Sequence, residues 1–210
     1  KRALVEHFDI SYELEHQIKG SSKEALLKST REMMDKCTFT FTRQTEMLGL
    51  GHAILKGEPL IGNEPFGVIL ADDLCVNEEG DNVLAQLVKI YDKYKCCVVA
   101  IQEVPKEETY KYGVIYGKEI QDDVFMISDM VEKPDPEDAP SNLAIIGRYI
   151  LTPDIFRTIE ETQPGKNEFI EITDAFMNHV KKGKRLDCGS VDGFVQATNY
   201  FYDKMKKESE

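Results

Sequence analysis

The sequence lacks two features that would point to a membrane or a nucleic acid. A membrane-spanning helix needs about 20 consecutive, mostly apolar residues, and no stretch of this chain approaches that length. The 210 residues carry a formal net charge of −12, whereas proteins that bind a nucleic-acid backbone usually present a basic face. We therefore expect no membrane partner and no nucleic-acid partner. A small phosphorylated ligand is compatible with this charge, because it needs only one or two local cations.

Cysteine is scarce, and no C-x-x-C motif occurs. The number is odd, and the five residues are Cys37, Cys75, Cys96, Cys97 and Cys188. This pattern favours free, partly buried thiols in a reducing compartment, so we expect a cytoplasmic protein. The sequence also lacks internal repeats and low-complexity segments. With 41% hydrophobic and 30% charged residues, the composition is that of an ordinary globular protein.

Apolar runs alternate with helical patterns in the middle of the chain. Residues 66–71 (FGVILA) are apolar on consecutive positions, as a buried parallel strand requires. Residues 81–94 carry a helical pattern, and residues 96–104 form a second apolar run. This spacing predicts a βαβ unit. Regular patterns earlier in the chain predict helices over residues 21–37 and 51–61 and a strand, alternating Thr and Phe, over residues 38–43.

Three strand-like runs follow without room for helices between them, over residues 112–117, 124–134 and 143–151. We expect antiparallel ribbons or an inserted sheet there. The predicted fold class is therefore α/β, with a mixed, mainly parallel sheet that is flanked by helices and carries a small antiparallel β insertion.

The last third of the chain returns to helical patterns. Helices are expected to begin at Thr152-Pro153 and at Thr173-Asp174, where a capping residue precedes a helical pattern. A short strand over residues 185–189 and a closing amphipathic helix over residues 191–205 are expected to complete the chain.

Two carboxylates, Asp72 and Asp73, follow the first apolar run directly. Ligands of open α/β sheets bind beyond the carboxyl ends of the strands. Adjacent side chains at a strand end diverge, so one aspartate can face the cleft while the other caps the turn. A cleft carboxylate beside a phosphate needs a divalent cation between them, and Mg²⁺ prefers one or two carboxylates together with phosphate oxygens and water. The alternative for these two residues is a solvated Asp-Asp turn.

Other polar residues also stand at the ends of predicted elements. Glu132 and Lys133 precede a proline, where the lysine can neutralise a phosphate and the glutamate can bind sugar hydroxyls, or where the two can form a surface ion pair. Gly49 and Gly51 precede a predicted helix and let the backbone approach a flat ring closely. Their spacing is not G-x-G-x-x-G or a Walker motif, which argues against a dinucleotide site or a P-loop. Asp187 can be a second metal ligand or a turn residue.

Taken in order, these motifs resemble those of a known family. The segments RQTEMLGLGHA, FGVILADD, YKYGV, MVEKP, APSNLAIIGRYIL, EITDA and DCG are similar to those of the bacterial UTP–glucose-1-phosphate uridylyltransferases, over nearly the whole chain. The resemblance implies a Rossmann-like nucleotidyltransferase fold, expected as one domain over residues 1–210. It also implies transfer of UMP from UTP to glucose 1-phosphate, with release of pyrophosphate. Mg²⁺ and a homo-oligomer, either a dimer or a tetramer, are expected as well.

The resemblance also assigns roles to single residues. They are Gln44 and Gly49 at the uracil edge, Asp72 and Asp187 at the metal, Gly113 and Glu132 at the glucose, and Lys133 at its phosphate. Lys133 and Asp72 are thus the candidates for catalytic residues. Asp73 receives no role.

One part of the family pattern is missing from this sequence. The family begins with a strand and a basic, glycine-rich G-x-G-T-R-type loop that grips the triphosphate, and the chain has neither. We therefore expect an N-terminally truncated enzyme that is inactive as these 210 residues alone. The close alternatives are a glucose-1-phosphate thymidylyltransferase or another sugar-nucleotide pyrophosphorylase. An alternative of a different class is a non-catalytic sugar-nucleotide-binding domain.

Overall fold

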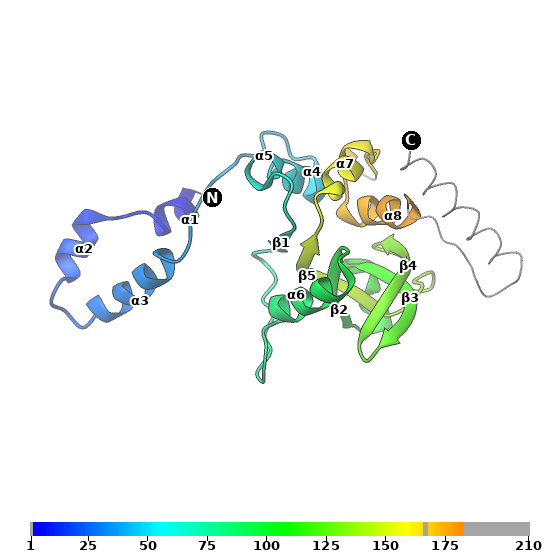
Figure 1. Ribbon diagram of the computed structural model, residues 1–210, viewed down its shortest axis with the longest axis horizontal. Coiled ribbons are helices and arrows are strands. Elements are labelled where there is room, and N and C mark those ends of the chain that lie inside the picture. Colours follow the sequence, from blue (N-terminus) through cyan, green and yellow to red (C-terminus); the bar gives the residue numbers. More distant parts are fainter. Residues whose placement is uncertain (1, 166–167, 183–210) are drawn as a thin grey trace, which may run out of the picture. The chain divides into compact units, whose positions relative to one another are not determined.

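The computed structural model describes residues 2–165 and 168–182, and its contacts divide the chain into two units (Figure 1). The first unit ends at Arg43 and the second begins at Gln44. The single domain over residues 1–210 stays a prediction. The strand and helix expected over residues 185–189 and 191–205 lie outside the described residues, as does Asp187.

The first unit consists of short helices and an irregular segment. The helices are α1 (Arg2–His7), α2 (Tyr12–Ile18) and α3 (Glu24–Met34). Arg31 of α3 forms an ion pair with Glu15 of α2, and Phe39 stacks on Phe8 with 4.5 Å between ring centroids. The strand predicted over residues 38–43 is wrong, because those residues are irregular and no described strand pairs with them. A Thr/Phe alternation forms a strand only beside a neighbour that supplies the cross-strand contacts.

Strand β5 lies at the centre of the sheet in the second unit. The strands are β1 (Phe66–Ile69), β2 (Val98–Glu103), β3 (Gly113–Gln121), β4 (Val124–Glu132) and β5 (Leu143–Leu151). Ile150 of β5 pairs with both Gly67 of β1 and Val98 of β2, so these two strands flank β5 on opposite sides. At its other end β5 pairs with β3, which forms an antiparallel ribbon with β4. The antiparallel arrangement predicted for these last three strands is therefore confirmed.

The mainly parallel sheet is not what the described residues form. β1 and β2 run in the same direction, as the two ends of a βαβ unit must. β5 lies between them and runs the opposite way, so it pairs antiparallel with both. The β3–β4 and β3–β5 pairs are antiparallel as well, so every described strand pair is antiparallel. The first predicted strand is also shorter than residues 66–71 and is not fully buried, since Gly67 and Ile69 are exposed while Phe66 and Val68 are half-buried.

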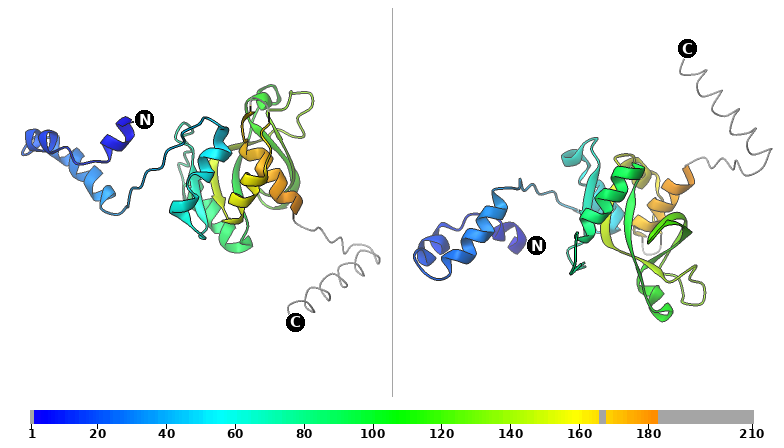
Figure 2. Two further views of the ribbon diagram at one scale, coloured as in Figure 1. Left: turned by 90° about the horizontal axis from the view of Figure 1, so that it is seen from above. Right: turned by 60° about the horizontal axis from the view of Figure 1, so that its bottom comes forward.

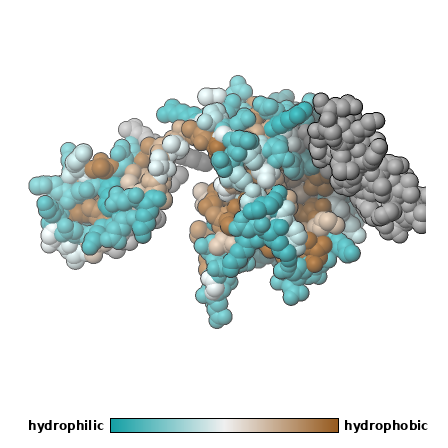
Figure 3. All heavy atoms as spheres, viewed as in Figure 1, coloured by the Kyte–Doolittle hydropathy of each residue, from teal (hydrophilic) through white to brown (hydrophobic). Residues whose placement is uncertain are grey.

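The exposed edge of β1 continues into an apolar segment. Ile69, Leu74 and Val76 are 57%, 88% and 79% exposed. Figure 3 shows apolar side chains gathered at the border of the second unit where β1 and the following segment lie. Among the described residues β1 pairs only with β5, so its second edge presents unpaired backbone groups beside apolar side chains, a surface that natural sheets usually cover.

Helices cover both faces of the sheet in the second unit (Figures 1 and 2). They are α4 (Gly49–Leu55), α5 (Glu58–Ile61), α6 (Val83–Tyr94), α7 (Asp154–Glu161) and α8 (Ile172–Lys182), together with a 3₁₀ turn, η1 (Lys106–Lys111). Because side chains alternate along a strand, Tyr149 of β5 joins the main core with α4, α7 and α8, whereas Ile150 joins a smaller core with Leu87 of α6. The helix predicted over residues 51–61 is interrupted at Lys56 and Gly57, before the proline of α5. No helix of the described ranges is both long and apolar enough to span a membrane.

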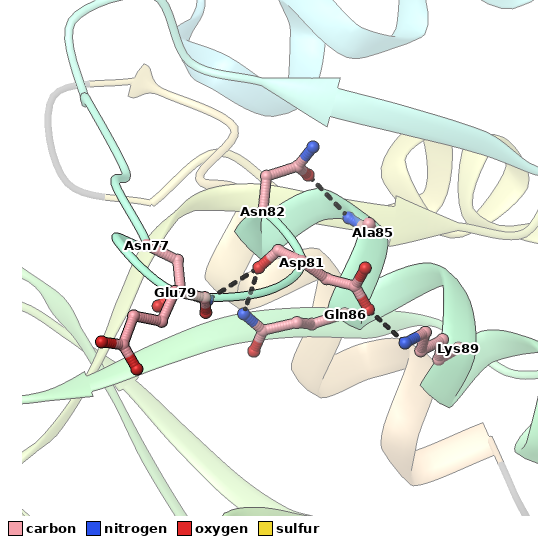
Figure 4. A network of polar contacts seen from close by, with 7 residues as sticks. All are labelled: Asn77, Glu79, Asp81, Asn82, Ala85, Gln86 and Lys89. Atoms are coloured by element: carbon pink, nitrogen blue, oxygen red, sulfur yellow. Dashed lines mark hydrogen bonds and ion pairs between the residues drawn. The ribbon is translucent and has the colours of Figure 1, made fainter.

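The start of α6 is fixed by a network of polar contacts (Figure 4). The side chain of Asn82 caps the helix by accepting a hydrogen bond of 2.9 Å from the backbone N–H of Ala85. The preceding turn is closed by Asn77, whose amide donates to the carbonyl of Asp81 at 2.8 Å, and Asp81 forms an ion pair with Lys89. These contacts hold α6 in place as the crossover between β1 and β2.

Replacing Asn82 with Ala is expected to lower the free energy of unfolding by about 1 kcal/mol, because the N–H of Ala85 loses its acceptor. Urea denaturation of the two proteins measures the difference. Asn82→Asp is the matched control, since it keeps an oxygen at the cap and should stay within a few tenths of a kcal/mol of the parent, by the same rule. An Asn82→Ala protein as stable as the parent would show that the cap contributes nothing.

Candidate active site

The two adjacent aspartates after β1 have separate environments. The half-buried Asp73 accepts a hydrogen bond of 2.7 Å at Oδ2 from the backbone N–H of Gly147 in β5. Asp72 is exposed, and within the described residues its side chain makes no hydrogen bond or ion pair. Asp73 is therefore bonded into the protein, while the carboxylate of Asp72 remains available to a ligand.

Tyr149 of β5 is surrounded by carboxylates from two elements. Its side chain is 4% exposed, and burial together with the negative charges of Glu132, Asp73 and Asp72 raises the pKa of Tyr149 to about 12. The phenol is therefore protonated at neutral pH and can act as a hydrogen-bond donor. The charges that act on this phenol thus come from the end of β4 and from the aspartate turn. Tyr149 was not predicted as a site residue, although it lies within the apolar run over residues 143–151.

The end of β4 brings three of the predicted residues together. Thr173 donates a hydrogen bond of 2.7 Å to Oε2 of Glu132, and Nζ of Lys133 lies 3.3 Å from Oε1 of Glu132. Gly113 of β3 pairs with Glu132, and a Cβ at Gly113 would lie 2.7 Å from Oγ1 of Thr173 and 3.1 Å from Oε2 of Glu132. Only glycine leaves that space open beside the glutamate. Thr173, which starts the predicted helix, was not expected at the site.

Lys133 has an unusual backbone conformation and an accessible side chain. Its φ is 45°, in the left-handed region that non-glycine residues seldom adopt. The conformation is held by a hydrogen bond of 3.0 Å from its backbone N–H to the carbonyl of Tyr112. The side chain is 56% exposed, so the ion pair with Glu132, which was one of the two alternatives, leaves the ammonium group accessible to an anion.

Negative charge accumulates around Glu132. Burial, followed by the charge of Glu132, raises the pKa of Glu171 above its ordinary value, and the nearby Lys133 acts in the opposite direction. Burial and the charge of Glu132 also raise the pKa of Asp174. These carboxylates, together with Asp72 and Asp73, make a region that attracts cations.

Of the predicted nucleotide residues, Gln44 lies in an irregular segment and Gly49 begins α4, close to this acidic region. The side-chain amide of Gln44 donates to the carbonyl of Gly49 at 3.0 Å and also lies 3.0 Å from Nδ1 of His52. Gly49 has a φ of 89°, and a Cβ there would lie 2.9 Å from the carbonyl oxygen of Ile170, the residue before Glu171. Glycine is therefore required at this position on two grounds, conformation and space.

The residues that are described fit a divalent metal only as part of a larger set of ligands. Within residues 2–165 and 168–182 no three His, Cys, Asp or Glu side chains converge as a metal cage. The free carboxylate of Asp72 suits a metal that keeps most of its coordination for water and substrate phosphates, which is the habit of Mg²⁺. Asp187, the other predicted ligand, lies outside the described residues.

Comparisons with known proteins show the family to which the chain belongs. Residues 10–202 match the family model described as nucleotidyl transferase, and the chain belongs to that family of enzymes. It is 61% identical to UTP–glucose-1-phosphate uridylyltransferase of Pseudomonas aeruginosa, over 99% of this chain and 77% of that one.

Solved structures give the same result. Apo UDP-glucose pyrophosphorylase is 56% identical, with a TM-score of 0.82, over 98% of this chain and 78% of that one. UDP-glucose pyrophosphorylase complexed with UDP-glucose is 54% identical, with a TM-score of 0.80, over 97% of this chain and 78% of that one. The family resemblance and the Rossmann-like nucleotidyltransferase fold are thus confirmed. Nucleotidyltransferases generally use a divalent metal ion.

The raised pKa of Glu171 predicts a pH-dependent effect on stability. The charged carboxylate destabilises the folded state at neutral pH, and this penalty disappears as the pH falls through the folded-state pKa to the ordinary value of 4.5. Glu171→Gln should therefore be more stable than the parent at pH 7 and equal to it below about pH 4.5. Urea unfolding between pH 4 and pH 8 measures this difference.

Glu160→Gln is the control, because it removes an exposed carboxylate from α7. It should follow the parent over the whole pH range. A Glu171→Gln protein that is no more stable than the parent at pH 7 would show that the charge of Glu171 does not destabilise the folded state.

Proposed function

We propose that this protein transfers UMP from UTP to glucose 1-phosphate and so forms UDP-glucose and pyrophosphate. The observation that carries the proposal is the 61% identity, over nearly the whole chain, with a UTP–glucose-1-phosphate uridylyltransferase. The environment of Glu132 and Lys133 supports it, because a sugar phosphate needs hydroxyl acceptors and a phosphate-binding cation close together. A solved relative is complexed with UDP-glucose, which is the sugar nucleotide that this reaction would form.

The reaction needs alignment and charge neutralisation more than acid–base chemistry. A phosphate oxygen of glucose 1-phosphate attacks the α-phosphorus of UTP, and the bond from that phosphorus to the bridging oxygen of pyrophosphate breaks. The attacking phosphate is already an anion, so no side chain has to remove a proton from it. The protein must instead bring two anions together in line and balance their charge.

Lys133 and Asp72 are proposed to carry this balance. The accessible ammonium group of Lys133 would bind the phosphate of glucose 1-phosphate. Asp72 would hold Mg²⁺, with Asp187 as the second candidate ligand. When bound, the ion supplies charge neutralisation at the α-phosphate and the leaving pyrophosphate.

The remaining residues are proposed to bind the sugar and the base. Glu132, fixed by Thr173, would accept hydrogen bonds from glucose hydroxyls in the space that Gly113 leaves open. The protonated phenol of Tyr149 would donate to an oxygen of the ligand. Gln44 and Gly49 would contact the uracil edge, with the backbone at Gly49 providing the close approach.

Two further features of the protein remain proposals. The chain is proposed to form a homo-oligomer, either a dimer or a tetramer, and the exposed apolar side chains of the first unit, among them Ile10, Tyr12 and Leu14, support this if they gather in one patch, since such patches mark interaction sites. The described cysteines Cys37, Cys75, Cys96 and Cys97 are free thiols, which supports the cytoplasm as the compartment.

The direct test of the function is a substrate panel. The protein that carries this chain is assayed for pyrophosphate release with nucleoside triphosphates and sugar 1-phosphates in all combinations. UTP with glucose 1-phosphate should give the highest kcat/KM. A preference for dTTP would indicate a thymidylyltransferase, and binding of UDP-glucose without turnover of any pair would indicate a non-catalytic domain.

Replacing Asp72 with Asn is expected to abolish Mg²⁺-dependent turnover while the fold is retained, because a ligand charge is lost without a change of shape. The measurement is kcat over a Mg²⁺ titration, with circular dichroism as the check on folding. Asp73→Asn should be much milder, since asparagine keeps an acceptor oxygen for the N–H of Gly147. Near-normal activity of Asp72→Asn at saturating Mg²⁺ would remove Asp72 from the metal site.

Replacing Lys133 with Ala is expected to lower kcat/KM for glucose 1-phosphate by at least about tenfold, which corresponds to about 1.4 kcal/mol. A charge-assisted hydrogen bond contributes roughly 1.5–3 kcal/mol, so the loss of one contact is sufficient. The melting temperature should change little, since exposed ion pairs contribute little to folding. Lys118→Ala, at an exposed position of β3, is the matched control for removal of a positive charge. A lower melting temperature with unchanged kinetics would identify Glu132–Lys133 as a structural pair.

A further inference from the structure

The turn that carries Asp72 is bonded to one residue of the central strand. The guanidinium group of Arg148 donates from Nη1 to the carbonyl of Leu70 at 3.2 Å and from Nη2 to the carbonyl of Asp73 at 2.8 Å. Nη1 also donates to the carbonyl of Gly147 at 2.7 Å. Arg148 is half-buried, and although carboxylates surround this region, its described partners are all backbone carbonyls.

Gly147 and Asp73 complete the attachment from the other side. The N–H of Gly147 donates to Oδ2 of Asp73, and the carbonyl of Gly147 accepts from the N–H of Leu70 at 3.0 Å. A Cβ at Gly147 would lie 2.8 Å from Cβ of Leu70 and 2.9 Å from Cβ of Asp73. The turn thus lies so close to β5 that only glycine fits at position 147. We call Arg148, Gly147 and Asp73 the turn anchor.

The turn anchor holds the chain on both sides of Asp72. β1 ends at Ile69, so the ladder of the sheet does not extend to Asp72. The bonds to Leu70 and Asp73 leave only Ala71 and Asp72 between the two attached residues. Because the side chain of Asp72 makes no hydrogen bond of its own within the described residues, its position depends on this stretch of backbone. A metal ligand has to be held to within about 0.5 Å of its productive position.

We propose that Arg148 and Asp73 are positioning residues, which fix the backbone of the aspartate turn so that the carboxylate of Asp72 is held ready for its ligand. The planar, forked guanidinium group suits this task because it can reach two carbonyls at once, which a lysine cannot do with the same geometry. The assignment of that ligand as a metal–nucleotide complex rests on the proposed function. The attachment of the turn does not.

The test compares Arg148→Met with the parent protein in two independent measurements. Amide hydrogen exchange of the peptide that covers residues 70–74 should become at least about tenfold faster, because the variant loses the bonds to the carbonyls of Leu70 and Asp73. A tenfold change corresponds to about 1.4 kcal/mol of local protection. The Mn²⁺ or Mg²⁺ concentration for half-maximal turnover should rise at least severalfold, while KM for glucose 1-phosphate stays close to that of the parent. Arg157→Met is the matched control, since Arg157 is an exposed arginine paired with Glu161 on α7.

A pair of variants at Asp73 keeps the test valid if Arg148→Met does not fold. Asp73→Ala removes the acceptor for the N–H of Gly147 and should produce both changes. Asp73→Asn keeps an acceptor and should restore most of the parent behaviour. A turn that stays protected in Arg148→Met and Asp73→Ala would overturn the proposal. So would a turn that loses protection without any rise in the metal requirement, in a protein that Asp72→Asn inactivates.

Failure of the proposed function has a different signature. In that case the parent protein transfers no UMP, or Asp72→Asn is unimpaired, whatever the variants of the turn anchor do. Hydrogen exchange over residues 70–74 still decides whether Arg148 and Asp73 hold the turn. Unchanged exchange then overturns the proposal, and faster exchange supports it for whichever ligand Asp72 binds.

Discussion

The site depends on the antiparallel insertion of β5 between β1 and β2. These two pairings give β5 a neighbour on each side, so its residues are fixed in register with both strands. Alternation along β5 then places Tyr149 among the carboxylates and Ile150 in the opposite core. Arg148 and Gly147, next in the same strand, attach the turn that follows β1. A change of one residue in register would exchange these faces, and the site would be lost with the core.

The electrostatics of the site favour a ligand over the empty protein. Burial, followed by the charge of Glu132, raises the pKa of both Glu171 and Asp174, and Lys133 acts in the opposite direction at Glu171. Such an arrangement is unfavourable for the folded state alone and is typical of functional sites. A bound cation and a phosphorylated ligand bring charges of both signs to the region, with Asp72 available to the cation and Lys133 available to the phosphate.

The sequence revealed those parts of the structure that local patterns determine. Consecutive apolar runs identified β2 to β5, and the pattern over residues 81–94 identified α6, although not its capping asparagine. The aspartates at the end of β1 stood out because like charges seldom follow a buried run. The place of β5 between β1 and β2 could not be predicted, because strand order depends on long-range pairing that an apolar run does not encode. Tyr149 and Arg148 were missed for the same reason, since their roles come from neighbours that β5 brings to them.

A crystal structure of the protein with UDP-glucose and Mg²⁺ tests this account most directly. We expect the diphosphate between Asp72 and Lys133, the glucose beside Glu132 and Gly113, and Oδ2 of Asp73 still bonded to the N–H of Gly147. A nucleotide bound away from Tyr149 would contradict the assignment of the site. A metal ion held by Asp73 in place of Asp72 would contradict the division of roles between the two aspartates.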